Sequence, residues 1–195
     1  MTYWMVFHII AAYLLGSISS AILFTRFTKQ TDIREVGSGN PGTTNILRIA
    51  GKKAALVVFV FDVLKGALPV YTGFLIGYPT YILSIIAVAA CVGHMYPIYF
   101  NFKGGKAVAT ALGAMMPINW LLTLLLLSTW ISVFAICRIS SLAAIFTLLL
   151  APIYTYFIKP EFTLAVLTLC ILIILKHRKN ITRLIKKEES KFKQS

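Results

Sequence analysis

Acidic residues are scarce in this sequence. The 195-residue chain has six Asp and Glu against 19 Lys and Arg, which gives a net charge of +13. Charged residues make up only 13% of the chain, whereas roughly a quarter is usual in soluble domains. Hydrophobic residues make up 58%, and the mean hydropathy is +0.83. This composition excludes an ordinary soluble domain and predicts an integral membrane protein.

Cysteine is also rare. Cys91, Cys137 and Cys170 lie within or at the ends of apolar runs, without the spacing of metal ligands. This pattern excludes a disulfide framework and a zinc site, and we expect the three thiols to act as small apolar side chains. The first apolar segment lacks a basic start and an Ala-x-Ala site, so we expect no cleavable signal peptide.

The basic residues gather near the C-terminus. Eight of the 19 Lys and Arg lie between Lys176 and Lys193, directly after a long apolar run. Positive charge beside a membrane span is typical of the cytoplasmic side. We therefore interpret the cluster as a tail that contacts anionic lipid headgroups, and we expect no nucleic-acid partner.

Several apolar runs are long enough to cross a bilayer as helices, which takes about 20 residues. They extend from about Tyr3 to Phe24, Ala54 to Gly77, Tyr81 to Phe100, Trp120 to Ile136, Ser141 to Phe157 and Phe162 to Leu175. The flanking positive charges place the N-terminus outside and the C-terminus in the cytoplasm.

The charges of Lys106 and Arg138 require one further crossing. Both residues have a cytoplasmic character, so the chain between them must cross twice. The first of these crossings, from about Ala107 to Met116, spans only roughly 15 Å. A short or re-entrant helix needs surrounding protein or a water-filled cavity. The sequence therefore predicts an all-α integral membrane protein with seven transmembrane helices, one short or broken, in a single domain over residues 1–195.

Three polar clusters fall on the predicted cytoplasmic face, in loops at about 26–53, 101–110 and 176–189. In the first loop, Gly37, Gly39 and Gly42 free the backbone to turn its N–H groups inward as an anion nest. Arg34 and Arg48 add forked positive charge for phosphate or carboxylate. The alternative is a solvated loop in which the glycines serve only as turn residues.

The second and third clusters suit the same chemistry. Gly104-Gly105-Lys106 precedes the short helix, whose positive dipole end would face a cytoplasmic anion. His177, Asn180 and Arg183 follow one another at intervals of three residues, so they share one face of a helix. The alternative for this segment is a basic membrane-flanking helix with an incidental histidine. Charge and spacing alone support only an anion site on the cytoplasmic face.

Few ionisable residues lie inside the predicted spans. Asp62 and Lys65 are three residues apart on one helix, where they can be neighbours. Charge within a bilayer is costly, so the pair is either a structural device or part of a site. We expect His94, near the end of the third span, to orient backbone rather than to catalyse.

Taken together and in order, these motifs resemble the acyl-phosphate-dependent glycerol-3-phosphate acyltransferases, the PlsY family of bacterial inner membranes. The resemblance covers essentially the whole chain. It rests on Gly16-Ser17, Asp32-Ile-Arg34, Gly37-Ser-Gly-Asn-Pro-Gly-Thr-Thr-Asn45, Asp62-x-x-Lys65-Gly66, Gly93-His94, Phe102-Lys-Gly-Gly-Lys106 and His177-Arg-x-Asn-Ile-x-Arg-Leu184.

The resemblance implies a reaction. A fatty acyl group would pass from acyl phosphate to the 1-hydroxyl of sn-glycerol 3-phosphate, giving lysophosphatidic acid and inorganic phosphate. It implies no metal or other cofactor, a site on the cytoplasmic side of the bacterial inner membrane, and contact with membrane lipids. It also suggests the enzyme that produces acyl phosphate as a candidate partner.

The resemblance also implies which residues form the site. The candidate catalytic residues are Ser38, Arg48, His177 and Asn180. The candidate substrate-binding residues are Gly37, Gly39, Asn40, Thr43, Thr44, Asn45, Lys103, Gly104, Gly105, Lys106, Ser141, Arg183 and Glu189.

The sequence departs from the family pattern at two notable positions. Ala107 stands where the family commonly has the last glycine of Gly-Gly-Lys-Gly, and Lys187 stands where a glycine usually precedes the glutamate. The added methyl of Ala107 bears on phosphate affinity rather than on the reaction.

Two other functional classes remain as alternatives. A small anion transporter would also use a broken helix near glycine-rich loops, but it needs polar groups at the midplane and on both faces. A purely structural membrane protein leaves the three clusters unexplained. The acyl-CoA-dependent acyltransferases typically have His-x4-Asp, and none of His8, His94 and His177 has an aspartate five positions later.

Overall fold

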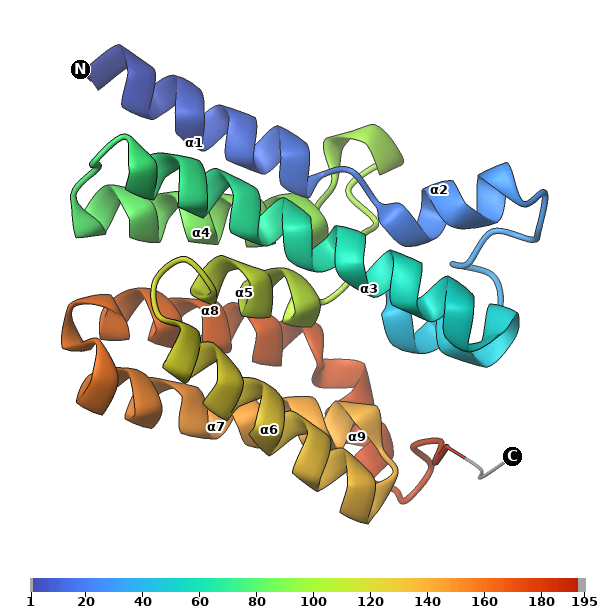
Figure 1. Cartoon of the computed structure of the whole chain (residues 1–195). Coiled ribbons are helices and arrows are strands. Elements are labelled where there is room, and N and C mark those ends of the chain that lie inside the picture. The colour runs from blue at the N-terminus through green and yellow to red at the C-terminus, as the bar shows by residue number, and fades with distance from the viewer. Residues whose placement is uncertain (1, 193–195) are drawn as a thin grey trace. The chain divides into compact units, whose positions relative to one another are not determined.

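The computed structural model describes residues 2–192, and these residues form helices and connecting loops with no strand (Figure 1). They divide into two compact units, one extending to Ile118 and the other beginning at Asn119. The first unit comprises α1 (Thr2–Gly16), α2 (Ser20–Phe27), α3 (Thr43–Leu75), α4 (Thr80–Met95), the 3-10 helix η1 (Ile98–Phe100) and α5 (Val108–Met115). The second comprises α6 (Trp120–Cys137), α7 (Ser140–Ile158), the 3-10 helix η2 (Pro160–Phe162), α8 (Thr163–Lys176) and α9 (Arg178–Ile185).

Four helical segments of the described chain are long and apolar enough to cross a membrane: α3, α4 extended to Phe100, α6 and α7. Two bent pairs raise this number to six if each forms one span. These are α1 with α2, bent by 43°, and η2–α8 with α9, bent by 61°. The outward faces carry large exposed apolar side chains, such as Phe61 and Leu68 of α3. Lipid is the medium that such faces require.

The structure corrects several predicted boundaries. The first span is not continuous from Tyr3 to Phe24, because α1 ends at Gly16 and α2 begins at Ser20. The second span does not begin at Ala54, because α3 already begins at Thr43. Gly51, with φ 81° and ψ −175°, separates a polar first segment of α3 from its apolar remainder.

The polar loops are correspondingly shorter than predicted. The first loop is residues 28–42 rather than about 26–53, because helices occupy both of its ends. In the second predicted loop, α5 takes over at Val108, and in the third, α9 occupies residues 178–185. The helix ends beside these loops carry charged residues, as the loops themselves do, so the sequence did not show where each helix begins or ends.

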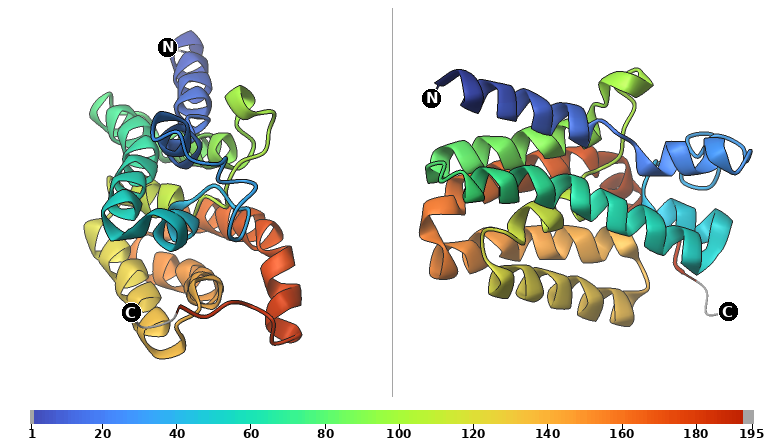
Figure 2. Two further views of the ribbon diagram at one scale, coloured as in Figure 1. Left: turned by 90° about the vertical axis from the view of Figure 1, so that its right-hand side faces the viewer. Right: turned by 45° about the horizontal axis from the view of Figure 1, so that its top comes forward.

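Paired glycines allow two helix pairs in the first unit to approach closely, α1 with α4 and α3 with α5 (Figure 1, Figure 2). A Cβ atom on Gly66 would overlap the carbonyl of Thr110, and one on Gly113 would overlap the carbonyl of Val63. Since side chains gain little by leaving lipid for another apolar surface, membrane helices rely on such close packing. The short α5 is therefore held against α3 backbone to backbone.

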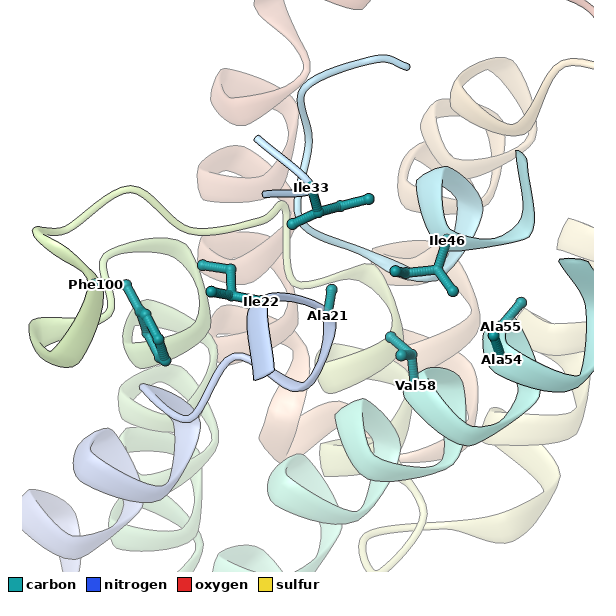
Figure 3. Packing of buried hydrophobic residues seen from close by; sticks show 8 residues of the cluster. All are labelled: Ala21, Ile22, Ile33, Ile46, Ala54, Ala55, Val58 and Phe100. Atoms are coloured by element: carbon teal, nitrogen blue, oxygen red, sulfur yellow. The ribbon is translucent and has the colours of Figure 1, made fainter. Parts of the chain in front are cut away.

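A cluster of buried apolar side chains lies where α2, the 28–42 loop, both segments of α3 and η1 meet (Figure 3). Its members are Ala21, Ile22, Ile33, Ile46, Ala54, Ala55, Val58 and Phe100. Ile33 belongs to the loop itself and is fully buried, as is Ile46 in the first turns of α3. Burial of one such side chain stabilises by roughly 1.5–3 kcal/mol. The polar loop is therefore fixed by apolar contacts beneath it.

The close approach of α3 and α5 predicts the effect of Gly66→Ala. The added methyl would meet the Thr110 backbone, so we expect a loss of about 1–3 kcal/mol in stability, as for overpacked cores. Thermal unfolding in detergent measures this loss. Gly73→Ala is the matched control, because its methyl would meet side-chain atoms of Leu83, Ile86 and Tyr78 and no backbone atom among its nearest neighbours. An equal effect of the two substitutions would contradict the interpretation.

Candidate functional site

The first polar loop is organised around the buried side chain of Asn45, which is 1% exposed. Its Oδ1 accepts the backbone N–H of Ser38 at 2.9 Å. Its Nδ2 donates to the carbonyls of Ile33 at 3.1 Å and Val36 at 2.9 Å. Asn45, predicted to bind substrate, thus directs these hydrogen bonds to its own loop. Its position indicates that it shapes the loop.

Three backbone N–H groups of this loop are committed to bonds within the loop or to Asn45 and are not available to the predicted anion nest. The N–H of Ser38 is used by Asn45, the N–H of Gly39 donates to Val36 O at 3.0 Å, and that of Gly42 donates to Asn40 O at 3.0 Å. Gly37 and Gly39 do adopt positive φ, at 61° and 68°. These glycines serve a tight turn that leaves the side chain of Ser38 exposed. Substrate binding by Gly37 and Gly39 stays a prediction.

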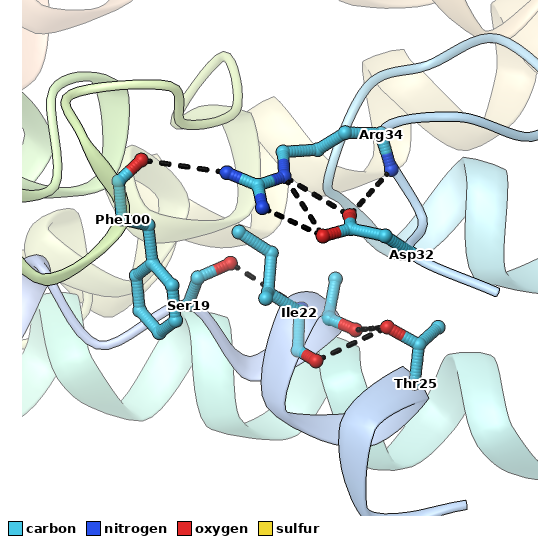
Figure 4. A network of polar contacts seen from close by, with 7 residues as sticks. Ser19, Ile22, Thr25, Asp32, Arg34 and Phe100 are labelled. Atoms are coloured by element: carbon cyan, nitrogen blue, oxygen red, sulfur yellow. Dashed lines mark hydrogen bonds and ion pairs between the residues drawn. The ribbon is translucent and has the colours of Figure 1, made fainter. Parts of the chain in front are cut away.

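Arg34 is committed to an internal contact (Figure 4). Its guanidinium lies 2.6 Å from Asp32 Oδ2 and 3.0 Å from Oδ1, and its Nη1 donates to Phe100 O at 3.4 Å. The hydrogen bond from Arg34 lowers the pKa of the Asp32 carboxyl, against the opposing effect of burial. Arg34 therefore ties the loop to η1.

The second polar loop folds against the first. The N–H of Gly105 donates to the carbonyl of His94 at 3.1 Å. A Cβ atom at Gly105 would overlap Nε2 of His94 and would lie 2.9 Å from the carbonyl oxygen of Pro41. Gly105 therefore sits between α4 and the first loop, and only glycine fits there. Lys106 follows immediately and is half-buried, whereas Lys103 is exposed.

Ala107 begins α5 with an unfavourable backbone. Its φ of 62° and ψ of 19° are left-handed, and Val108 is the first helical residue. Lys187 is also left-handed, with φ 60°. A left-handed conformation costs a residue with a Cβ roughly 1–2 kcal/mol and costs glycine little. Both positions at which the sequence departs from a family glycine therefore keep a backbone that suits glycine.

In the second unit, Glu189 gathers the third cluster. Its Oε1 accepts from Ser141 Oγ at 2.8 Å and from Asn180 Nδ2, and its Oε2 accepts from Arg183 Nε at 2.6 Å. Burial raises the pKa of the Glu189 carboxyl, but hydrogen bonds from Arg183, Asn180 and Ser141 outweigh it and lower the pKa below its ordinary value. The structure thus brings four predicted site residues together.

His177 lies at the bend between α8 and α9 and is 2% exposed. Its Nδ1 is 2.8 Å from the carbonyl oxygen of Ile173. Since a carbonyl can only accept, Nδ1 carries the proton and Nε2 is the basic nitrogen of the neutral ring. The backbone contact therefore fixes the tautomer as well as the orientation.

The remaining predicted residues lie on the same elements. Gly37 and Gly39 are exposed, Asn40, Thr43, Thr44 and Arg48 are half-buried, and Gly104 is half-buried. The contacts of Phe192 were not predicted from the sequence. Its N–H donates to Arg138 O at 2.9 Å, and its ring packs edge-on against Phe134. An aromatic residue in a lysine-rich tail was the available signal. Within residues 2–192, no group of three His, Cys, Asp or Glu side chains is arranged to hold a metal ion.

A family model described as glycerol-3-phosphate acyltransferase matches residues 6–187. The chain belongs to the PlsY family of glycerol-3-phosphate acyltransferases. It is 57% identical to the glycerol-3-phosphate acyltransferase of Vibrio campbellii over 93% of this chain and 89% of that protein. It is 53% identical to that of Idiomarina loihiensis over 95% of this chain and 94% of that protein.

Solved structures support the same family. The chain resembles the crystal structure of PlsY, an integral membrane glycerol 3-phosphate acyltransferase, in its glycerol 3-phosphate form, with a TM-score of 0.93 and 36% identity over 97% of this chain and 96% of that one. The lysophosphatidic acid form gives a TM-score of 0.91 and 35% identity over 97% and 95%. The resemblance drawn from the motifs is confirmed, and the chain is an integral membrane acyltransferase of phospholipid synthesis. Family membership removes the transporter and structural alternatives.

The left-handed backbone of Ala107 predicts that Ala107→Gly stabilises the protein. Without a Cβ atom, the left-handed conformation is no longer strained. This effect outweighs the greater freedom of glycine in the unfolded chain, so we expect a net gain in stability of about 0.5–1 kcal/mol. Thermal unfolding in detergent measures the gain. Ala109→Gly, inside α5, is the matched control and should lose about 0.5–1 kcal/mol. A loss in both variants would contradict the backbone assignment.

The Glu189 network predicts a stability that depends on pH. Because the folded pKa lies below the ordinary value of 4.5, the ionised carboxyl stabilises the fold above that pH, and the stabilisation is lost as the pH falls through the folded pKa. We therefore expect Glu189→Gln to lower the melting temperature at pH 7, with the difference from the wild type disappearing in acid. The exposed neighbour Glu188 supplies the control, Glu188→Gln. A pH-independent difference for Glu189→Gln would rule out this linkage.

Proposed function

We propose that acyl phosphate is the acyl donor, and that the chain transfers its fatty acyl group to the 1-hydroxyl of sn-glycerol 3-phosphate, giving lysophosphatidic acid and inorganic phosphate. The contact between Pro41 and Gly105 carries this proposal. It joins the loop that leads to Arg48 with the loop that bears Lys103 and Lys106. A reaction in which both substrates and both products are phosphates uses cations from two adjacent loops.

The proposed chemistry needs no covalent enzyme intermediate. The glycerol hydroxyl oxygen attacks the acyl carbonyl carbon and forms the ester bond. The bond from that carbon to the phosphate oxygen breaks, and the phosphate leaves with the electron pair. Arg48 and Lys106 would neutralise phosphate charge during this step, and the hydroxyl of Ser38 would donate a hydrogen bond.

The hydroxyl proton has two candidate acceptors. Nε2 of His177 is a basic nitrogen in a fixed orientation, so His177 is one candidate acceptor. Alternatively, His177 only orients a substrate group, and a phosphate oxygen of the substrate takes the proton. The roles of His177 and Asn180 rest on the family motif. Asn180 donates a hydrogen bond to Glu189, which holds the Asn180 side chain in place.

The proposal includes the membrane topology. The four long helical segments and the two bent pairs supply six crossings, and α5 would be the seventh, at half length. The N-terminus would lie outside and the C-terminus in the cytoplasm of a bacterial inner membrane, with the site on the cytoplasmic side. Exposed Arg26, Lys52 and Lys53 flank the first polar loop and exposed Lys29 lies within it, which is typical of a cytoplasmic loop. The acyl chain would stay in the bilayer, and the enzyme that makes acyl phosphate is a candidate partner.

A donor assay tests the proposed function. The protein in detergent is given glycerol 3-phosphate with either acyl phosphate or acyl-CoA, and lysophosphatidic acid and free phosphate are measured. We expect both products from acyl phosphate and neither from acyl-CoA. Product from acyl-CoA alone would overturn the donor while leaving the family intact.

The same assay separates the residues. Removing a charge or donor that acts on the transition state costs about 100-fold or more, so Arg48→Ala and Ser38→Ala should lose at least that much turnover. Lys52→Ala is the control, since Lys52 is an exposed cation on the same helix as Arg48. Near-normal turnover in both His177→Ala and Asn180→Ala would contradict a catalytic role for the third cluster.

A further inference from the structure

The first unit contains a buried group of ionisable side chains that the proposed reaction does not use. Asp62, Lys65 and His94 are 2%, 5% and 7% exposed. Asp62 Oδ1 accepts from Lys65 Nζ at 2.8 Å and from Ser20 Oγ at 2.7 Å, and His94 Nδ1 lies 3.6 Å away from it. Burying these charges is costly unless each is paired and hydrogen-bonded.

At one end, the group joins the broken first span to α3. Lys65 Nζ donates to the carbonyl of Ile18 at 2.9 Å, and Ile18 lies in the break between α1 and α2. Ser20, which donates to Asp62, is the first residue of α2. A helix break leaves backbone carbonyls without helical partners. The Asp62–Lys65 pair satisfies one of these carbonyls and is itself held in place by the break.

At the other end, the group reaches the second polar loop through His94. The Nδ1 edge of the imidazole faces Asp62, whereas its Nε2 is the atom that a Cβ at Gly105 would overlap. The carbonyl of His94 also accepts the N–H of Gly105 at 3.1 Å. Both the ring and the backbone of His94 therefore contact Gly105, whose other side faces the carbonyl of Pro41.

We propose that His94 is a positioning residue for the glycerol 3-phosphate subsite. The Asp62–Lys65 pair fixes the imidazole, and the imidazole holds Gly105 against Pro41. The backbone of Gly105 in turn sets the place of Lys106 relative to the first loop. This inference rests on the proposed role of Lys106 in binding phosphate. His94 acts through the loop and does not touch the reacting atoms.

The expected signature is a loss of affinity for one substrate. Without the imidazole, the loop can move away from Pro41, so His94→Ala should raise the KM for glycerol 3-phosphate roughly tenfold, with kcat within about threefold. The KM for acyl phosphate should stay within about twofold. His94→Gln keeps a planar polar group that can donate toward Asp62, so it should restore most of the affinity.

The connection to the buried pair is tested by a double-mutant cycle. Asp62→Asn should raise the same KM, and adding it to His94→Ala should raise it little further, because both act through one contact chain. His8→Ala is the matched control. His8 is likewise a histidine of the first unit, and its Nε2 lies 3.0 Å from both Pro69 O and Thr72 Oγ1 in the apolar part of α3. Its KM for glycerol 3-phosphate should not change.

Several outcomes would overturn the proposal. One is a fall in melting temperature with an unchanged KM for glycerol 3-phosphate, which marks His94 as a core residue only. Another is a fall in kcat with unchanged KM, which marks it as catalytic. If His94→Ala does not fold, His94→Gln and Asp62→Asn are compared with the wild type by the same criteria.

Failure of the proposed donor is recognised separately. In that case the wild type would be inactive with acyl phosphate, and glycerol 3-phosphate binding would be measured directly by calorimetry. Weaker binding in His94→Ala than in His8→Ala would still support the positioning role. Equal binding would reject it whatever the donor.

Discussion

The carboxylate of Asp62 is the group on which the first unit depends most. It is almost completely buried in a chain whose surroundings are apolar, and there an uncompensated charge is prohibitively costly. Ser20 and Lys65 both donate to it directly, and they belong to α2 and α3. The need to compensate one charge therefore fixes the start of α2, the middle of α3 and, through His94, the end of α4. These elements carry the two polar loops.

Close contact between helix backbones stabilises the packing of helices here, whereas burial of apolar side chains does so in soluble proteins. Gly66 and Gly113 let α3 and α5 approach until their backbones touch, so a helix of eight residues is held without a large side-chain interface. Gly105 does the same for a loop, between His94 and Pro41. At each of these three glycines an added Cβ atom would overlap a neighbouring atom, so a larger residue does not fit.

The first and third polar clusters are organised by different kinds of side chain. In the first unit, an amide, Asn45, donates to and accepts from the backbone of a loop, so the loop has a shape before any substrate arrives. In the second unit, a carboxylate, Glu189, accepts from three side chains that come from α7 and α9. An internal acceptor of this kind leaves Arg183 less positive charge for a phosphate than the sequence suggested. Arg34, paired with Asp32, shows the same effect.

The sequence by itself determined the membrane class, the positions of α6 and α7 to within about a residue of their ends, and the family. Apolar runs of sufficient length and an ordered set of motifs are properties that can be read along the chain. The Asp62–Lys65 contact was also predictable, because the two residues lie one helical turn apart. Only the tertiary structure decided that Asn45 faces inward, that the N–H groups of Ser38, Gly39 and Gly42 are used within the first loop or by Asn45, and that His94 meets Gly105. These depend on hydrogen-bond partners and backbone angles that residue types do not fix. A glycine that permits a turn and a glycine that admits a neighbouring ring look the same in a sequence.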